Sequence, residues 1–226
     1  KGIREERMGE TNMDKMWLKN YPEGMPAEID ADQFRSIPDL LDKLFSKFAD
    51  KPAYHNLGRT ISYAELEALS RAFAAYLQGL PGMARGERVA IMSPNLLQYP
   101  VVLFGILRAG MVVVNVNPLY TPRELEHQLQ DSGARAIVIV ENFASTLQQV
   151  LGKTRVKHVI TTQVGDLLPI PKRWLVNFVI KYVRKMVPAW QIDGATTLDA
   201  ALERGRSAPF NPVDIHAEDL AFLQYT

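Results

Sequence analysis

The chain has 226 residues, of which 47% are hydrophobic and 23% charged, as is typical of a globular protein long enough to bury a sizeable core. Its formal net charge of +1 gives no bulk attraction for nucleic acid, so we expect no nucleic-acid partner. With no cysteine, the chain has no disulfides, thiolate metal sites or cysteine nucleophiles, and no apolar run reaches the ~18 residues of a membrane span.

The amino-terminal third opens with a polar stretch and then alternates helix and strand signals. Residues 1–12 are charged and lack apolar periodicity, which predicts a disordered tail or a cloning remnant ahead of a native start at Met13. Ser36 is placed to cap a helix whose apolar residues recur at helical spacing. Residues 53–63 predict a strand pair that turns at Gly58, and a capping box at Ser62 opens a helix that reaches Leu77.

The rest of the chain is organised around residues 88–126, which predict strand, helix, strand and helix in that order. A short apolar strand at 89–92 is followed by a mostly apolar helix at 96–109, which Gly110 ends. The β-branched run at 111–116 fits a strand covered on both faces. Thr121 then caps a helix with Pro122 at its first position and Glu124 completing a capping box.

Strand starts recur at a constant interval, which predicts the fold class. They fall near Val89, Val112, Ala136 and His158, with separations of 23, 24 and 22 residues. That interval is the βα period of a doubly wound α/β fold, with a mainly parallel sheet and helices on both faces. Asp219 to Thr226 predict a last strand entering the same sheet.

This period is interrupted at residues 163–192, where a basic amphipathic helix is predicted. Arg173, Asn177, Lys181 and Arg184 fall on one stripe of that helix, and bulky apolar residues that include Trp174 and Phe178 cover much of the rest. Such a helix suits an anionic membrane interface. A surface helix with a solvated basic edge is the alternative, and the sequence leaves both open.

Candidates for chemistry are few. The sequence has no dinucleotide fingerprint, no P-loop and no nucleophile elbow, and its histidines lack metal-ligand spacing, so no metal site is predicted. We assign His127 to a solvated helix face and Tyr99 to the core. Asn117 and Tyr120 follow a parallel strand, where open α/β sheets bind ligands. We favour turn chemistry for Asn117 and a hydrophobic staple for Tyr120.

Three blocks of sequence resemble the adenylate-forming acyl-CoA synthetases, and most of all the bacterial long-chain fatty acid–CoA ligases. They are ISYAELEALSRAFAAYL at 61–77, the run from RVAIMSPN to GARAIVI at 88–139, and DLAFLQYT at 219–226. The first resembles the family signature L-[ST]-Y-x-E-L, with Ile61 in place of leucine. The likeness runs from about Met13 to the end, so residues 13–226 are expected to form the amino-terminal subdomain of that fold, incomplete at residue 226.

The resemblance implies a ligase reaction with ATP and Mg²⁺. Fatty acid and ATP give an acyl-adenylate and pyrophosphate, and the coenzyme A thiol then displaces AMP. Tyr225 and Thr226 match the first two residues of the family's phosphate loop, and the remaining catalytic segments would lie beyond them. We therefore expect no catalytic residue within these 226 residues and no activity from them alone.

The resemblance also gives the basic helix a role. A long-chain acid partitions into membrane, so Arg173, Trp174, Phe178, Lys181 and Arg184 are expected to support peripheral association with the cytoplasmic face of the inner membrane. The protein is otherwise expected in the cytoplasm, and a homodimer is left open.

Rival hypotheses remain at this stage. They are an adenylating ligase for another carboxylic acid, such as a medium-chain or aryl acid; a non-catalytic nucleotide- or lipid-binding α/β module; and a peripheral membrane adaptor that uses the basic helix alone.

Overall fold

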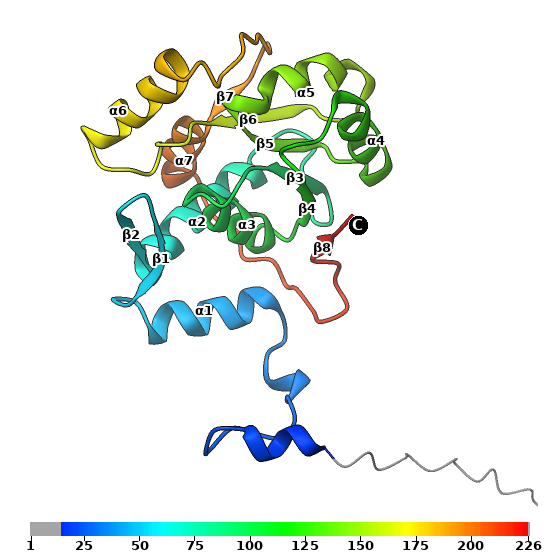
Figure 1. Cartoon of the computed structure of the whole chain (residues 1–226). Coiled ribbons are helices and arrows are strands. Elements are labelled where there is room, and N and C mark those ends of the chain that lie inside the picture. Colours follow the sequence, from blue (N-terminus) through cyan, green and yellow to red (C-terminus); the bar gives the residue numbers. More distant parts are fainter. Residues whose placement is uncertain (1–14, 226) are drawn as a thin grey trace, which may run out of the picture. The chain divides into compact units, whose positions relative to one another are not determined.

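A computed structural model describes residues 15–225 of the chain (Figure 1). The chain divides into two compact units, residues 1–33 and residues 34–226. The described part of the first contains two short 3₁₀ helices, Met16–Asn20 and Ala31–Gln33. The predicted tail at residues 1–12 lies outside the described residues. All that follows concerns the second unit.

The second unit alternates strands and helices as the sequence predicts. Its strands are β1 (Pro52–Asn56), β2 (Arg59–Ser62), β3 (Arg88–Met92), β4 (Val112–Val116), β5 (Ala136–Val140), β6 (His158–Thr162), β7 (Thr196–Thr197) and β8 (Phe222–Leu223). Its helices are α1 (Ile37–Lys47), α2 (Tyr63–Gln78), α3 (Gln98–Arg108), α4 (Pro122–Ser132), α5 (Ala144–Val150), α6 (Lys172–Phe178) and α7 (Leu198–Ser207). A π-helical segment, Val179–Val183, continues α6, and 3₁₀ turns at Glu141–Phe143 and Leu151–Lys153 flank α5.

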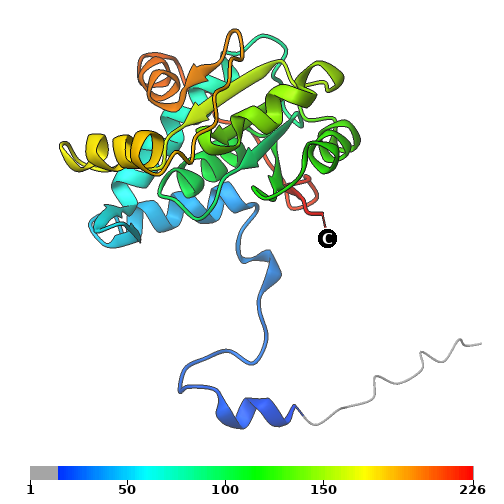
Figure 2. The ribbon, with the colours of Figure 1, turned by 45° about the horizontal axis from the view of Figure 1, so that its top comes forward.

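Six strands form one parallel sheet in the order β7-β6-β5-β3-β4-β8, and β1 and β2 form a separate antiparallel hairpin. The two ribbon views show helices on both faces of this sheet, with α6 at its β7 side and β8 at the opposite edge (Figures 1 and 2). The doubly wound α/β class predicted from the strand interval is therefore confirmed.

Alternate residues of the central strands enter two separate cores, one on each face of the sheet. In β3, Val89 and Ile91 pack with α1, α2, α3 and α7, whereas Ala90 and Met92 pack with α4 and α5. All four side chains are at most 1% exposed. Burial on both faces explains why the strands are apolar throughout instead of alternating with polar residues.

The predicted caps are mostly present. Thr121 and Glu124 form the reciprocal capping box at the start of α4, and Ser36 accepts the backbone N–H of Asp39. The box predicted at Ser62 is only half right. Ser62 does accept the N–H of Glu65, but the Glu65 carboxylate lies 2.5 Å from the Arg59 guanidinium, so it is engaged in an ion pair with the hairpin.

Two boundaries differ from the prediction. α3 begins at Gln98, because Ser93-Pro94-Asn95 and the turn after them extend further than expected. The last strand pairs with β4 only at Phe222 and Leu223, opposite Val113 and Val114, so it is much shorter than the predicted 219–226. A two-residue edge strand forms few ladder bonds, and the chain after it must be held by side chains.

Candidate functional site

The carboxyl edge of the sheet is the place where this topology positions ligands. The chain order reverses at β3: β4 lies on one side of it, and β5, β6 and β7 follow on the other. Open α/β sheets bind ligands beside such a switch point, in the crevice outside the carboxyl ends of the strands. The loops that begin at Ser93, Asn117, Glu141, Gln163 and Gln224 leave the sheet at this edge.

Cavity size alone does not identify the site. A mostly apolar cavity of about 540 Å³ lies at the amino edge of the sheet beside Arg88 and Val112, away from the switch point. A smaller one, about 360 Å³, opens at the carboxyl end of β3 between the β1–β2 hairpin and α3, and Tyr54 and Tyr99 line it. We give weight to the second because topology places ligand chemistry at that edge.

The loop after β4 has structural roles, as favoured from sequence. Asn117 Oδ1 accepts the backbone N–H of Leu119 at 3.0 Å and so closes a turn. Tyr120 packs into the same core as Leu125, four residues into α4, which is the arrangement of a hydrophobic staple. His127 is exposed on α4. Within residues 15–225, no three His, Asp or Glu side chains gather where they could hold a metal ion.

Tyr225 leaves the short strand β8 at this carboxyl edge. Its hydroxyl donates to Asp131 Oδ2 at 2.6 Å, and its ring packs into the core beneath α4 and α5. Burial, with the hydrogen bond to Asp131 next in importance, raises the pKa of Tyr225 to about 12. Thr226, the other predicted phosphate-loop residue, lies outside the described residues.

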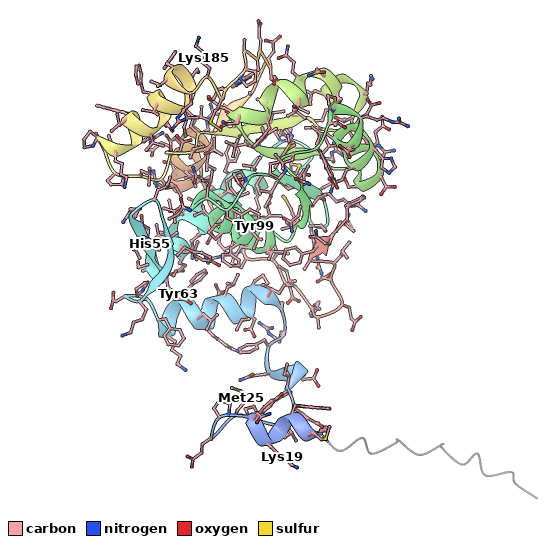
Figure 3. All side chains as sticks on the ribbon, viewed as in Figure 1. Lys19, Met25, His55, Tyr63, Tyr99 and Lys185 are labelled. Atoms are coloured by element: carbon pink, nitrogen blue, oxygen red, sulfur yellow. The ribbon has the colours of Figure 1, made fainter. Side chains whose placement is uncertain are left out.

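Asn115 was missed by the sequence reasoning, although it is the one polar residue of the β4 sequence VVVNV. Its side-chain amide bridges two elements: Tyr99 Oη on α3 donates to Asn115 Oδ1 at 2.9 Å, and Asn115 Nδ2 donates to Gln224 Oε1 at 3.1 Å. The assignment of Tyr99, labelled in Figure 3, to the core is therefore only partly right. Its ring packs against the core, but its hydroxyl takes part in this chain of hydrogen bonds. A lone amide in an apolar strand was the signal available.

The basic helix is held to the protein through part of its polar stripe. Its polar stripe faces the protein: Arg173 lies 3.1 Å from Asp166 and also pairs with Asp199, and Asn177 Oδ1 accepts the backbone N–H of Gly165 at 2.8 Å. Lys181 lies 3.9 Å from Glu141. The expectation of a solvated basic edge is therefore wrong for Arg173 and Asn177, because the buried carboxylate of Asp166, on the loop after β6, accepts hydrogen bonds from both.

The apolar side of the same helix faces outward. Trp174 is 65% exposed and Phe178 is 56% exposed, and large apolar side chains continue the surface along the π-helical segment and beyond it. These are Leu175, Tyr182, Val183 and Met186. We call this set, with Trp174 and Phe178, the α6 apolar face. The five predicted membrane residues thus divide: Trp174 and Phe178 lie on this face, Arg184 is exposed near it, and Arg173 faces the protein. Lys181 is exposed, although its ammonium group lies near Glu141.

Asp166 is the group that holds the polar side in place. It is 6% exposed and accepts four hydrogen bonds, from Thr162 Oγ1, the Gln163 backbone, Arg173 and Asn177. Burial raises the pKa of Asp166, and the donors from Gln163, Thr162 and Arg173 oppose that rise. A buried carboxylate with every oxygen engaged fixes α6 in one orientation.

Comparison with known proteins identifies the family. The family model described as "AMP-binding enzyme" matches residues 41–226, most of the chain. The chain belongs to this family. Curated relatives within it include long-chain-fatty-acid–CoA ligases of Salmonella typhimurium and Haemophilus influenzae, which are 55% and 56% identical over 95% of this chain. The chain spans 38% of the length of each of them.

Solved structures of two CoA ligases share the fold. The anthranilate CoA ligase AuaEII superposes with a TM-score of 0.67 at 19% identity, covering 85% of this chain and 32% of that one. A long-chain-fatty-acid-CoA ligase from Archaeoglobus fulgidus superposes with a TM-score of 0.64 at 24% identity, covering 85% of this chain and 34% of that one. No helix of the described residues is long and apolar enough to cross a membrane.

Proposed function

We propose that this chain is the amino-terminal part of an ATP-dependent long-chain fatty acid–CoA ligase. Identity of 55% over 95% of the chain to long-chain-fatty-acid–CoA ligases is the observation that carries this proposal. The reaction would couple fatty acid, ATP and coenzyme A through an acyl-adenylate, with release of pyrophosphate and AMP. Because the chain spans 38% of those relatives, the activity is proposed for a full-length protein and not for these residues alone.

The described residues prepare one edge of the nucleotide site in this proposal. Tyr225 is anchored by Asp131 at the carboxyl edge of the sheet, where the phosphate loop would begin. Mg²⁺ with ATP would supply charge stabilisation at the phosphates. Residues 15–225 contain no carboxylate cluster that fits the metal, so we assign no step of metal chemistry to them.

Adenylation assays on the full-length protein test the substrate class. Pyrophosphate exchange with palmitate is expected to exceed exchange with benzoate or 4-coumarate by at least about 100-fold, because four buried CH₂ groups already contribute about 3.2 kcal/mol. Faster exchange with an aryl acid would support the rival ligase for another carboxylic acid, which relatives such as a rice 4-coumarate–CoA ligase represent. No exchange with any acid would favour the non-catalytic module.

We propose in addition that the α6 apolar face docks on an anionic membrane surface. An amphipathic helix in a globular protein normally turns its apolar stripe toward the core, and here the polar stripe is turned inward instead. Such a continuous exposed apolar surface marks an interaction site. Solvent exposure of Trp174, Phe178 and Tyr182 has no structural benefit, since the contacts of Arg173 and Asn177 already hold the helix.

Charge selects an anionic lipid surface as the occupant. Residues 167–192 contain Lys172, Arg173, Lys181, Arg184 and Lys185 and no Asp or Glu. Arg184 and Lys185 are exposed beside the α6 apolar face, and Figure 3 marks Lys185 at the end of this segment. Cations flanking exposed aromatic and aliphatic side chains match the headgroup and acyl layers of an anionic leaflet. The surface would hold the ligase on the cytoplasmic face of the inner membrane, where long-chain acids are dissolved.

Vesicle sedimentation of the full-length protein tests this docking. R184E/K185E should weaken binding to phosphatidylglycerol vesicles by at least about thirtyfold, since each basic residue contributes about 1 kcal/mol. The matched control is R155E/K157E, which reverses two exposed charges ahead of β6. Equal binding by both variants would overturn the proposal. So would a stable dimer that buries the face and dissociates when Trp174 and Phe178 are replaced by serine.

A further inference from the structure

The chain after β8 is held from both faces of the sheet by side chains. β8, labelled in Figure 1, pairs with β4 only through Phe222 and Leu223, and the contacts of the next two residues lie on opposite faces of the sheet. Gln224 bonds to Asn115 on the α3 face, while Tyr225 bonds to Asp131 of α4 on the other. The side chains thus keep alternating between the two faces beyond the last pair of hydrogen-bonded strand residues. The side chains of Gln224, Asn115, Tyr225 and Asp131 replace the missing backbone hydrogen bonds.

Asn115 is the centre of this arrangement. Its side chain is partly buried and lies on the face of β4 opposite to that of the buried Val114 and Val116. The amide is fully oriented: Oδ1 accepts from Tyr99 and Nδ2 donates to Gln224. Tyr99 in turn packs against the core beneath α2 and α3. Asn115 therefore ties the end of β8 to a rigid part of the molecule.

The backbone of Asn115 carries a second tie. Gln128 Nε2, on α4, donates to the Asn115 carbonyl at 2.8 Å. Gln128 is 2% exposed, and its Oε1 has no hydrogen-bond partner among the described residues. A buried acceptor of this kind is normally satisfied. The Gln128 side chain thus holds the backbone of Asn115 from the α4 side of the sheet.

We propose that Asn115, through Tyr99 and Gln224, is a positioning residue that fixes Gln224 and Tyr225, the entry of the phosphate loop. The inference rests on the proposed ligase activity, which places the loop directly after Tyr225. Loop placement affects ATP more than fatty acid, because the loop contacts phosphate. A misplacement of about 1 Å at a reacting group lowers rates by as much as about 100-fold.

The experiment measures ATP–pyrophosphate exchange by the full-length protein with palmitate. N115L is expected to raise the KM for ATP about 10-fold and to leave the KM for palmitate within about twofold. N115D is expected to restore the KM for ATP, because a carboxylate still accepts from Tyr99 and the Gln224 amide can turn to donate to it. Q149L, on the exposed side of α5, is the matched control.

A double-mutant cycle shows whether Asn115 acts through Gln224. Q224L alone and N115L/Q224L together should have the same KM for ATP as N115L, because all three break one connection. Y99F, which removes a hydroxyl only, keeps the test informative if N115L fails to fold.

If the wild-type protein is active, either of two outcomes overturns the inference. One is a KM for ATP within about twofold of wild type in both folded N115L and Y99F. The other is additivity of the effects of N115L and Q224L in the double-mutant cycle. A wild-type protein without exchange activity overturns the ligase proposal itself, and this inference with it.

Discussion

The guanidinium of Arg173 on α6 lies 3.1 Å from the carboxylate of Asp166, a residue that is 6% exposed in the loop after β6. This pair, with Asn177 on Gly165, turns the polar side of the helix toward the protein. The α6 apolar face then has no position except outward. Which side of the helix faces the protein is set by a small number of specific hydrogen bonds, and not by hydrophobic burial.

Removal of Asp166 should release α6 selectively. D166A removes the carboxylate that accepts from Thr162 and the Gln163 N–H and leaves Arg173 paired with Asp199, and loss of one partner of such a buried pair costs about 3 kcal/mol. We expect faster amide hydrogen exchange in residues 172–183, while β3 and β5 stay protected. D193A removes an exposed carboxylate that bonds only to Gln191 and serves as the control. Unchanged exchange in α6 would contradict the assignment.

Trp174 should report membrane docking directly. In the 226-residue chain with Trp17 and Trp190 replaced by phenylalanine, Trp174 is the remaining tryptophan, and it is 65% exposed. Anionic vesicles should shift its emission to shorter wavelength, because indole moves from water into the interface. A protein that retains Trp190 alone is the comparison and should show no shift, since Trp190 packs against the core beneath α4 and α5. Vesicle binding without a shift in Trp174 emission would place the contact elsewhere.

The hydroxyl of Tyr225 should ionise at a higher pH than that of a free tyrosine, partly because of its contact with Asp131. Its pKa is raised from 10.0 to about 12, so the folded state holds this proton more tightly than the unfolded state does. The corresponding stability is complete below pH 10 and is lost as the pH rises toward 12. The absorbance difference between wild type and Y225F isolates this tyrosinate. D131N should move its titration to lower pH; a midpoint near 10 in wild type would contradict the contact.

Gly205 should tolerate no side chain. A Cβ at this position of α7 would lie 1.8 Å from the carbonyl oxygen of Ala72 in α2, a backbone atom that cannot move alone. We expect G205A to lower the free energy of unfolding by about 3 kcal/mol, measured by urea denaturation. Gly152 has open space where a Cβ would stand, so G152A should change stability by less than about 0.5 kcal/mol. Similar midpoints for the two variants would show that α2 and α7 separate easily.

Most of the fold follows from local signals in the sequence. Apolar β-branched runs at 22- to 24-residue intervals predict the parallel sheet, and Thr121 and Ser36 predict helix starts that the structure confirms. These signals work because each depends on neighbours within a few residues. The half-formed box at Ser62 shows the limit, since Glu65 has a competing partner, Arg59, in the preceding hairpin.

The sites depend on contacts between distant segments, and these were harder to predict. The period of residues 172–187 indicates an amphipathic helix but not which side faces the protein, because Asp166, Gly165 and Asp199 determine that. The Asn115–Gln224 bond likewise joins residues far apart in the chain. Here the sequence contained a clue, because an amide inside VVVNV requires a partner. Which residue is that partner could be determined only from the fold.

The brevity of β8 has a consequence for the order in which the sheet assembles. β3, β4, β5 and β6 follow one another along the chain, so they can pair as soon as each emerges from the ribosome. β8 arrives much later, after α6 and α7. Until then the edge of β4 at Val113 and Val114 has no neighbour, and such an edge recruits other chains. Late synthesis of a very short strand thus makes the nascent chain dependent on rapid closure of this edge to avoid aggregation.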